Sequence, residues 1–369
     1  MNLSYWEQKT WFSNIDFTVV GSGIVGLFCA LRLREDHPRA KIVVIDRGSL
    51  PTGASTKNAG FACFGSLSEL LSDLQSHSEQ EVYELVAQRW SGLQLLRKTL
   101  GDAAIDYKAW GGYELFNNAA LFEQCKNEQS RINALLAPLF TKDVFSFVSN
   151  TFGFKNIQPE LSYNAFEAQI DSGEMMKALI KKVQSHGIAL LQGIEVQEFN
   201  DLGDHVEVKT SIATFNTRSL FIATNGFANE LLDEPIQPAR AQVLITQPIK
   251  DLAIKGTFHL EGGYYYFRNI NDRILFGGGR NLDFKGETTT DFGQTEQIQT
   301  ALEVLLNTTI LPDSSYEIES RWSGIMGVGP QKKALVKPLS ENVFCGVRLG
   351  GMGVAIGSSI GNTLAKFVS

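Results

Sequence analysis

Residues 15–46, IDFTVVGSGIVGLFCALRLREDHPRAKIVVID, contain the pattern that decides the fold. The run Ile15–Val20 is short, apolar and rich in β-branched residues, which is typical of a buried parallel strand. Residues 21–26, GSGIVG, match G-x-G-x-x-G and open a helical stretch to Arg34, and residues 41–46 are a second buried strand. This order of strand, glycine turn, helix and strand predicts a βαβ unit of the Rossmann type.

The glycine turn predicts a dinucleotide-binding site. Gly21 permits the tight turn, Gly23 lets the backbone approach a pyrophosphate, and Gly26 allows close packing of helix on strand. The helix N-terminus directs free N–H groups at the phosphates. Asp46 ends the second strand, where a carboxylate accepts hydrogen bonds from an adenosine ribose and disfavours a 2′-phosphate. FAD and NAD both fit this pattern, and a structural turn with a solvent-facing Asp is the alternative.

Composition places the chain among globular proteins. Glycine makes up 34 of 369 residues, and hydrophobic residues make up 43%, which is enough apolar surface to exclude a disordered or collagen-like chain. The 33 basic and 40 acidic side chains give a net charge of −7, which argues against nucleic acid or an anionic membrane as the main partner. The length allows two domains.

The cysteines and the first residues bear on the cellular setting. Cys29, Cys63, Cys125 and Cys345 lie far apart without CxxC spacing, so we expect no metal site and no disulfide framework. The start, MNLSYWEQKT, lacks a basic region, and the apolar stretch 17–31 is short and contains glycines. These features predict a cytoplasmic protein with neither a signal peptide nor a membrane span.

Periodicity predicts further helices and strands. Helical spacing covers residues 66–100 with a break near 76–78, a capping signature at Asp171 predicts a helix over 172–186, and another is expected from Asp291 to about Asn307. Short apolar runs predict strands at 188–191, 196–199, 206–209, 212–215 and 220–223, followed by a strand-rich, antiparallel-looking region over about 240–280.

This order of elements predicts the fold class α/β with two domains. A Rossmann-like dinucleotide-binding domain, discontinuous in sequence, is expected from residues 1–90, 158–240 and 315–369. An α+β substrate domain built on a mainly antiparallel sheet is expected from residues 91–157 and 241–314.

Several segments beyond the glycine turn share one family pattern. Residues 46–48, DRG, and 53–60, GASTKNAG, are similar to the acidic–Arg–Gly and GAS-x-x-N-x-G segments of the D-amino acid oxidase and glycine oxidase family of FAD-dependent oxidoreductases. Further similar segments follow in family order: QID at 169–171, the strand around Val196, IATNG at 222–226, Trp322-x-Gly324, and GGMG at 350–353 with Gly357 and Gly361. The resemblance covers residues from about 15 to 367.

The resemblance implies FAD rather than NAD. A loop rich in glycine and small residues lets backbone amides approach a pyrophosphate and a flavin ring, and Ser55 and Asn58 add hydrogen bonds. The expected cofactor-binding residues are Gly21, Gly23, Ile24, Val25, Gly26, Asp46, Arg47, Ala54, Ser55, Asn58, Ala59, Gly60, Val196, Ala223, Thr224, Gly226, Gly351, Met352 and Gly353.

The resemblance also implies a reaction. In this family a C–H bond next to nitrogen delivers hydride to the flavin, and water hydrolyses the resulting imine. A small amine or amino acid is therefore the expected substrate, and oxygen or another carrier accepts the electrons. Two alternatives stay open, namely oxidation of a 2-hydroxy acid or polyol, and a flavin-binding electron-transfer subunit without its own small substrate. The five histidines are scattered and are expected at the surface or in helix caps, namely His37, His77, His186, His205 and His259.

The chain departs from the family pattern at the substrate. Glycine oxidase-like members hold the substrate carboxylate with an Arg where this chain has Met326, and a second family Arg aligns with Gly351. We hypothesise that Arg348 faces the substrate and binds an anionic group, with an interdomain salt bridge as the alternative. Tyr266 is the expected pocket residue of the aromatic run 264–267, because neighbouring strand residues face opposite ways, with packing in the core as the alternative. Met326 is a further candidate on the substrate side. Other positive candidates are Arg268, Arg280, Lys57, Lys332, Lys333 and Lys337.

A sarcosine-oxidase branch of the family links FAD to a Cys and uses a Lys for oxygen. The aligned positions here are non-cysteine residues around 324–325 and Leu275. The sequence therefore predicts non-covalent FAD and slow use of oxygen, with Cys63 and Cys345 expected to be buried small side chains.

Overall fold

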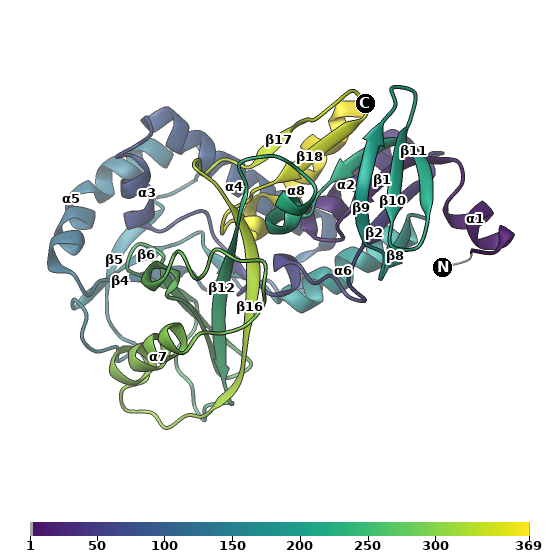
Figure 1. The fold of residues 1–369 in the computed structure, drawn as a ribbon. Coiled ribbons are helices and arrows are strands. Elements are labelled where there is room, and N and C mark those ends of the chain that lie inside the picture. The colour runs from purple at the N-terminus through teal and green to yellow at the C-terminus, as the bar shows by residue number, and fades with distance from the viewer. Residues whose placement is uncertain (1–2, 369) are drawn as a thin grey trace.

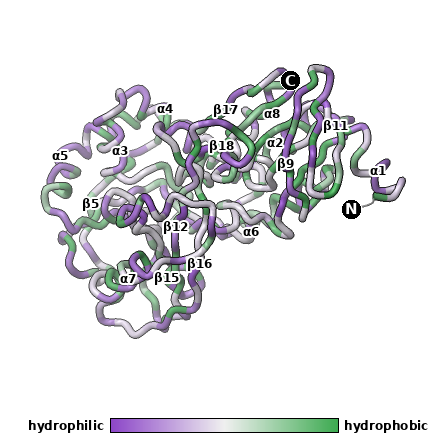
Figure 2. The backbone as a smooth tube through the Cα atoms, in the orientation of Figure 1, coloured by the Kyte–Doolittle hydropathy of each residue, from purple (hydrophilic) through white to green (hydrophobic). Residues whose placement is uncertain are grey.

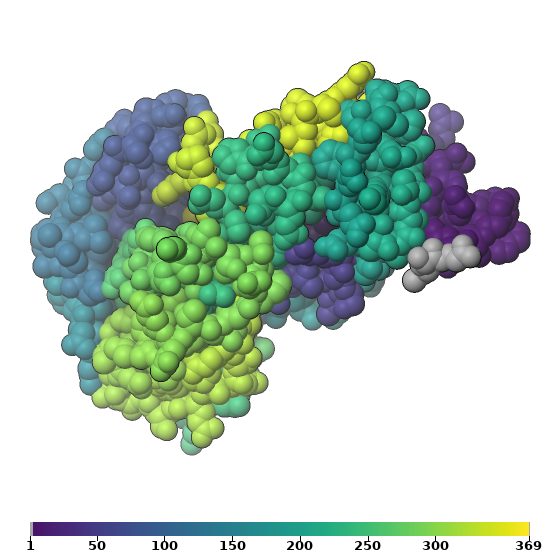
Figure 3. Space-filling view, viewed as in Figure 1, coloured from purple at the N-terminus to yellow at the C-terminus, as the bar shows by residue number. Residues whose placement is uncertain are grey.

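The computed structural model describes residues 3–368 and contains two sheet-based regions, which meet at the centre of the molecule (Figures 1 and 3). The first sheet has the order β17-β18-β11-β1-β2-β8, with β10 paired to β11 and β9 paired to β10. Its strands are β1 (Ile15–Val20), β2 (Ile42–Asp46), β8 (Ala189–Gln192), β9 (Val196–Asp201), β10 (Val206–Thr210), β11 (Thr214–Ile222), β17 (Leu335–Pro338) and β18 (Val343–Val347).

The predicted βαβ unit is confirmed. Strand β1 pairs in parallel with β2 and with β11, and β2 pairs in parallel with β8. Helix α2 (Ile24–Asp36) connects β1 to β2 and is buried along most of its length. Because parallel strands end at one edge, this arrangement gathers the loops after β1, β2 and β11 at a single side of the sheet.

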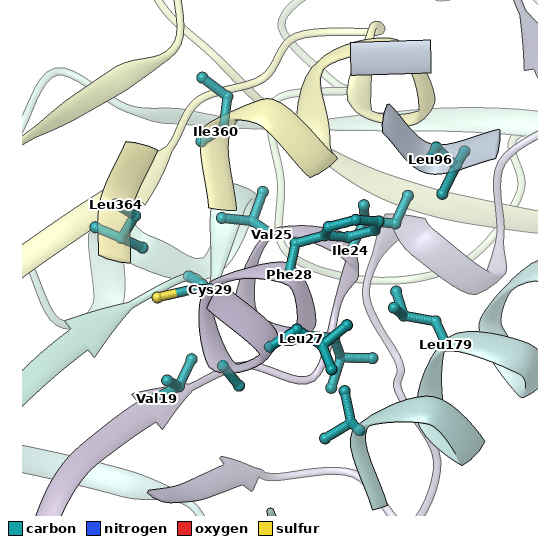
Figure 4. Packing of buried hydrophobic residues seen from close by; sticks show 14 of the residues in the cluster. Val19, Ile24, Val25, Leu27, Phe28, Cys29, Leu96, Leu179, Ile360 and Leu364 are labelled. Atoms are coloured by element: carbon teal, nitrogen blue, oxygen red, sulfur yellow. The ribbon is translucent and has the colours of Figure 1, made fainter. Parts of the chain in front are cut away.

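The helices of the first region pack on α2. They are α4 (Glu79–Leu100), α6 (Ser172–Ser185) and α8 (Gly353–Ala365). Figure 4 shows Val25 and Phe28 of α2 between Leu96, Leu179 and Ile360 of these three helices. Gly361 permits this approach, since a Cβ there would lie 2.5 Å from the Val25 carbonyl oxygen. Hydrophobic residues concentrate in these elements, whereas α1 (Tyr5–Trp11) buries none of its residues (Figure 2).

The second sheet has the order β16-β12-β15-β14-β13-β4-β6-β5. All its recorded pairings are antiparallel except β13 with β4, so the expectation of a mainly antiparallel sheet is confirmed. Its strands are β4 (Gly112–Leu115), β5 (Phe145–Ser149), β6 (Glu160–Asn164), β12 (Gln237–Thr246), β13 (Thr257–Leu260), β14 (Tyr265–Ile270), β15 (Arg273–Gly278) and β16 (Ile318–Val328).

Smaller elements complete the chain. Helices α3 (Leu67–Asp73), α5 (Ala119–Leu136) and α7 (Glu296–Leu305) flank the second sheet, and β3 (Phe61–Ala62) pairs with β7 (Ala168–Gln169) between the two regions. Short helical turns are η1 (Ala54–Thr56), η2 (Asp102–Ile105), η3 (Asn225–Glu230), η4 (Arg280–Leu282), η5 (Leu306–Ile310) and η6 (Lys366–Val368). Within residues 3–368, no helix has the length and apolar character needed to cross a membrane.

Two sequence expectations are corrected. The runs 212–215 and 220–223 form one strand, β11, because its first half pairs with β10 and its second half pairs with β1. The helix expected from Asp291 begins at Glu296, since the preceding backbone makes other contacts: Gly293 donates to Ser323 Oγ and Thr295 donates to Gln242 Oε1. The break between α3 and α4 and the helix after Asp171 are confirmed.

The strands divide between the sheets somewhat differently from the predicted domain boundaries. Strands β6 and β16 belong to the second sheet, although they lie within residues 158–240 and 315–369, which the sequence predicts for the dinucleotide-binding domain. Strand β16 enters the second sheet because it pairs with β12 over ten residue positions, from Gln237 to Thr246.

Candidate functional site

A cavity of about 890 Å³ is lined by both regions of the molecule. Its first end is formed by the loops after β1, β2 and β11 together with the N-terminus of α8, and its second end by residues of β12 to β16. This volume lies toward the upper end of the range typical of ligand sites, about 300–1,000 Å³. We call these parts the nucleotide end and the sheet end of the cavity.

The glycine turn at the nucleotide end excludes side chains by direct contact. A Cβ on Gly26 would lie 1.9 Å from the Gly21 carbonyl oxygen, so α2 could not begin where it does. Gly21 has a φ of 105°, which other residues rarely adopt. Gly23 caps α2 without a side chain, and the Ile24 N–H donates to Ser55 Oγ at 3.0 Å. The turn and the 53–60 loop are therefore joined beside the cavity.

Asp46 is held at the end of β2 by three hydrogen bonds. Its Oδ2 accepts from the Ser22 N–H at 2.8 Å and from Ser22 Oγ at 2.6 Å, and its Oδ1 accepts from the Gly48 N–H at 2.9 Å. A carboxylate offers about four acceptor positions, so these bonds fix the group and leave capacity for a ligand hydroxyl. Asp46 also lines the cavity, as the ribose-binding hypothesis requires.

Most of the predicted cofactor residues lie together around this cavity. The exceptions are Gly26 and Gly226, which have packing roles: a Cβ on Gly226 would lie 2.5 Å from the Met326 carbonyl oxygen. Those that line it are Gly21, Gly23, Ile24, Val25, Asp46, Arg47, Ala54, Ser55, Asn58, Ala59, Gly60, Val196, Ala223, Thr224, Gly351, Met352 and Gly353.

The nucleotide end fits a dinucleotide. Its glycines leave backbone exposed at the start of a helix, which suits phosphate groups. The Thr224 hydroxyl lines the cavity region and has no hydrogen-bond partner among residues 3–368, although it is buried. A buried hydroxyl without a partner is costly, and a bound ligand would satisfy it.

At the sheet end, strand alternation divides the aromatic run as expected. Tyr264 and Tyr266 line the cavity, whereas Tyr265 and Phe267 are buried in the core of the second sheet. The Tyr266 ring meets the Phe61 ring edge-on at 5.7 Å, and burial raises the pKa of Tyr266 to about 12. Met326 also lines the cavity. The substrate role of both residues stays a prediction.

Arg348 touches the cavity, but its guanidinium is engaged elsewhere. The residue has a φ of 63° and is 6% exposed. Its Nε and Nη2 donate to the Lys333 carbonyl at 3.3 and 3.2 Å, and its Nη1 donates to the Pro235 carbonyl at 3.4 Å. These bonds hold the backbone around β17 and favour a structural role over anion binding.

His259 is the main residue that sequence reasoning missed. It was expected at the surface or in a cap, but it is 5% exposed on β13 and lines the cavity. Its Nε2 lies 2.6 Å from Glu167 Oε1, which also accepts from Thr257 Oγ1 at 2.7 Å. Burial works to lower the pKa of His259, but the Glu167 carboxylate outweighs it and raises the pKa to about 9. The two residues lie 92 positions apart in the sequence, so no local sequence pattern predicts their pairing.

Solved structures with the same fold cover nearly the whole chain. Glycine oxidase from Geobacillus kaustophilus is 16% identical with a TM-score of 0.78, over 96% of this chain and 94% of that one. L-proline dehydrogenase from P. horikoshii is 18% identical with a TM-score of 0.75, over 96% and 93%. Iminodiacetate oxidase from Chelativorans sp. is 17% identical with a TM-score of 0.76, over 95% of both chains. These likenesses show the fold.

Curated relatives match only in part. The bifunctional protein ThiO/ThiG of Synechocystis sp. is 23% identical over 249 residues, which is 62% of this chain and 32% of that protein. Its counterpart in Trichormus variabilis is 26% identical over 176 residues, which is 45% of this chain and 25% of that protein. The chain therefore spans about a quarter to a third of the curated relatives that it matches.

The family comparison covers almost every described residue. The model of the FAD dependent oxidoreductase (DAO) family matches residues 16–367, from β1 through α8. This range includes both ends of the cavity. The match confirms FAD as the cofactor expected from the resemblance, and the chain belongs to the family of FAD-dependent oxidoreductases.

Proposed function

We propose that this chain oxidises the C–N bond of a small amino acid or amine, with FAD as the hydride acceptor. The observation that carries the proposal is the shared cavity: residues that fit a dinucleotide and residues of a separate sheet line one space. The family match supports flavin chemistry, and structural neighbours that include a glycine oxidase, an iminodiacetate oxidase and an L-proline dehydrogenase support nitrogen-containing substrates.

The chain's part in this reaction is to bind and orient, since FAD when bound supplies the hydride-accepting chemistry. Phe61, Tyr266 and His259 form an aromatic wall, with the Phe61 ring 5.3 Å from His259 and 5.7 Å from Tyr266. The Phe61 and Tyr266 rings hold an apolar part of a substrate and exclude water, whereas the charge of protonated His259 is balanced by Glu167. The α8 N-terminus contributes N–H groups beside Gly351 and Gly353, where negative charge is stabilised.

Non-covalent attachment of FAD is the mode typical of the family and agrees with the residues present. Gly324 and Ile325 stand where the sarcosine-oxidase branch has its linking segment. Cys63 lines the cavity, but burial raises the pKa of its thiol well above the usual range, so the nucleophilic thiolate is disfavoured. Acid precipitation tests this attachment: colourless protein and yellow supernatant are expected, and a yellow pellet would contradict it.

The electron acceptor is part of the proposal. Leu275 stands where the sarcosine-oxidase branch has its oxygen-linked Lys, and it is a buried residue of β15. This position supports another carrier as the main acceptor, with oxygen as a slow one. Cytoplasmic location is likewise proposed, supported by four buried cysteines that form no disulfide.

Anaerobic titration tests the proposed reaction. FAD-loaded protein is mixed with panels of amino acids, simple amines, 2-hydroxy acids and polyols, and the visible flavin band is followed against free FAD in the same buffer. Bleaching by amino acids or amines supports the proposal. Bleaching by hydroxy acids or polyols alone would replace it with the oxygen-side alternative. No bleaching by any compound would favour an electron-transfer subunit.

A further inference from the structure

The cavity is lined by several cations, and most of them already have partners. Arg47 donates to Glu230 at 2.7 Å, Lys332 pairs with Asp73, and Arg89 donates to the Phe64 carbonyl at 2.7 Å. Arg348 donates to two carbonyls, as described above. Arg47, Lys332 and Arg348 therefore have little capacity left for a substrate. The Nε of Arg89 also lacks a partner among residues 3–368, but Arg89 is 5% exposed and lies in the field of two carboxylates, Glu69 and Asp73.

Arg280 differs from these cations in the partners of its guanidinium. It lines the cavity at the start of η4, and no ion pair or hydrogen bond from its guanidinium occurs within residues 3–368. Its Nε is buried without a partner, and its guanidinium stacks on the Phe284 ring at 5.0 Å. Burial lowers the pKa of Arg280. Glu287, a nearby carboxylate, is engaged by Arg240 at 2.8 and 2.9 Å.

The backbone before Arg280 explains its position. Gly278 and Gly279 have φ of 131° and 77°, and the Gly279 N–H donates to the Tyr264 carbonyl at 3.0 Å. A Cβ on Gly278 would lie 2.1 Å from that same carbonyl oxygen. The glycines therefore press the end of β15 against Tyr264 and turn the chain so that the next side chain borders the sheet end of the cavity.

Lys57 also lines the cavity and forms no ion pair with a carboxylate in the described part of the chain. Its Nζ lies over the Phe292 ring at 5.1 Å, and the residue follows η1 in the 53–60 loop. A Cβ on Gly324 would contact its Cβ at 3.1 Å. Lys57 thus belongs to the cofactor loop, whereas Arg280 comes from the second sheet.

We infer that Arg280 holds a carboxylate of the substrate, so that the substrate is an amino acid, free or N-substituted, rather than a simple amine. This rests on the proposed C–N oxidation and assigns its substrate class. A partly buried guanidinium without a counter-ion is unfavourable, and a carboxylate satisfies it with two parallel hydrogen bonds. The Phe284 ring lies against the guanidinium and meets the Tyr264 ring edge-on at 6.1 Å, so aromatic residues border the proposed anion site.

Binding of an unreactive probe tests the assignment without turnover. Benzoate and its neutral isostere benzamide are titrated into FAD-loaded wild type, Arg280→Met, Arg280→Lys and Arg273→Met, and binding is followed by calorimetry and by the visible flavin band. Arg273 is the matched control, because it begins the same strand and pairs with Glu319 outside the cavity. Flavin content and melting temperature establish that each variant is folded.

We expect Arg280→Met to raise the Kd for benzoate by about tenfold or more and to leave that for benzamide unchanged. Arg280→Lys should recover part of the loss, because it restores charge without the planar fork. Arg273→Met should bind both probes like wild type. The assignment is overturned if benzoate binds wild type no more tightly than benzamide does, or if Arg280→Met leaves the Kd for benzoate within about twofold.

Wild type and Arg280→Met also distinguish a failure of this assignment from a failure of the proposed reaction. If amines bleach the flavin of wild type and Arg280→Met equally, and benzoate binding is independent of Arg280, C–N oxidation stands and the anchor is wrong. If benzoate binding depends on Arg280 but no amine or amino acid bleaches the flavin, the anion site stands and the proposed reaction is wrong.

Discussion

The two ends of the cavity are built in different ways. At the nucleotide end, contacts come from backbone exposed by glycines and from short loops that follow consecutive strands. At the sheet end, contacts come from side chains on β12 to β16, and one of these, His259, pairs with Glu167, which lies 92 positions away in the sequence. The nucleotide end therefore depends on steric fit, and the sheet end depends on charge and side-chain identity.

The largest effect is expected from closing the nucleotide end. Gly26→Ala places a Cβ 1.9 Å from the Gly21 carbonyl, so β1 and α2 must separate at a cost of roughly 3 kcal/mol or more. We expect the purified variant to retain no FAD and the flavin-free protein to melt at a lower temperature. Gly53→Ala is the control for stability, because its Cβ meets nothing within 4 Å. Equal melting temperatures for the two variants would refute the steric account.

The next effect concerns the buried ion pair at the sheet end. Glu167→Gln removes the carboxylate that stabilises His259, and breaking such a pair costs about 3–5 kcal/mol. Other carboxylates near His259 are Glu69 and Glu114, whose weaker influence also favours the charged ring. We expect a lower melting temperature at pH 7 with flavin binding at the nucleotide end retained, because Glu167 does not line the main cavity.

The same pair predicts a pH dependence. The pKa of His259 is raised to about 9, so the stability that the pair contributes is complete below about pH 6.5 and is lost as pH rises through about 9. The melting temperature of wild type should fall between pH 7 and pH 10 more steeply than that of Glu167→Gln. Parallel curves for the two proteins would show that His259 is not protonated in the folded state.

A moderate effect is expected at Asp46. Asp46→Ala leaves the Ser22 and Gly48 donors without their acceptor and removes the proposed ribose contact. The loss of such bonds is worth about 1–3 kcal/mol, which corresponds to a rise in the Kd for FAD of roughly five- to a hundred-and-fiftyfold. Fluorescence titration of flavin-free protein with FAD measures it, and an unchanged Kd would contradict the assignment.

The smallest effect is expected outside the cavity. Arg273→Met breaks a partly exposed pair with Glu319, and such pairs contribute about 0–1 kcal/mol. Chemical denaturation should show a change within that range. A larger loss of unfolding free energy would mean that ion pairs outside the cavity stabilise β15 as strongly as the charged residues at the sheet end.

The sequence predicts the nucleotide end well because its signals are local. The turn at 21–26, the acid at Asp46 and the loop at 53–60 are each read from a few neighbouring residues, and they meet because parallel strands end at one edge. Gly26 and Gly226 do not line the cavity. The sequence does not distinguish them from the glycines that do, because close packing and close approach of a ligand both require a missing side chain.

The sheet end could be predicted only in outline. Alternation along β14 placed Tyr266 at the cavity, but the engagement of Arg348 with the Lys333 and Pro235 carbonyls depends on tertiary contacts and on a positive φ. The pairing of His259 with Glu167 joins distant segments. Helix α7 begins at Glu296, later than the sequence predicts, because Gln242 on β12 accepts a hydrogen bond from the Thr295 backbone. This contact is also tertiary, so no local pattern indicates it.

The most direct test of the central claim compares two binding constants in two variants. The Kd for FAD and, with flavin saturating, the Kd for benzoate are measured in Asp46→Ala and Arg280→Met. We expect Asp46→Ala to weaken FAD binding alone and Arg280→Met to weaken benzoate binding alone, because Asp46 lies at the nucleotide end of the cavity and Arg280 at the sheet end. If both variants weaken both ligands by the same factor, the division of the cavity into a cofactor end and a substrate end is wrong.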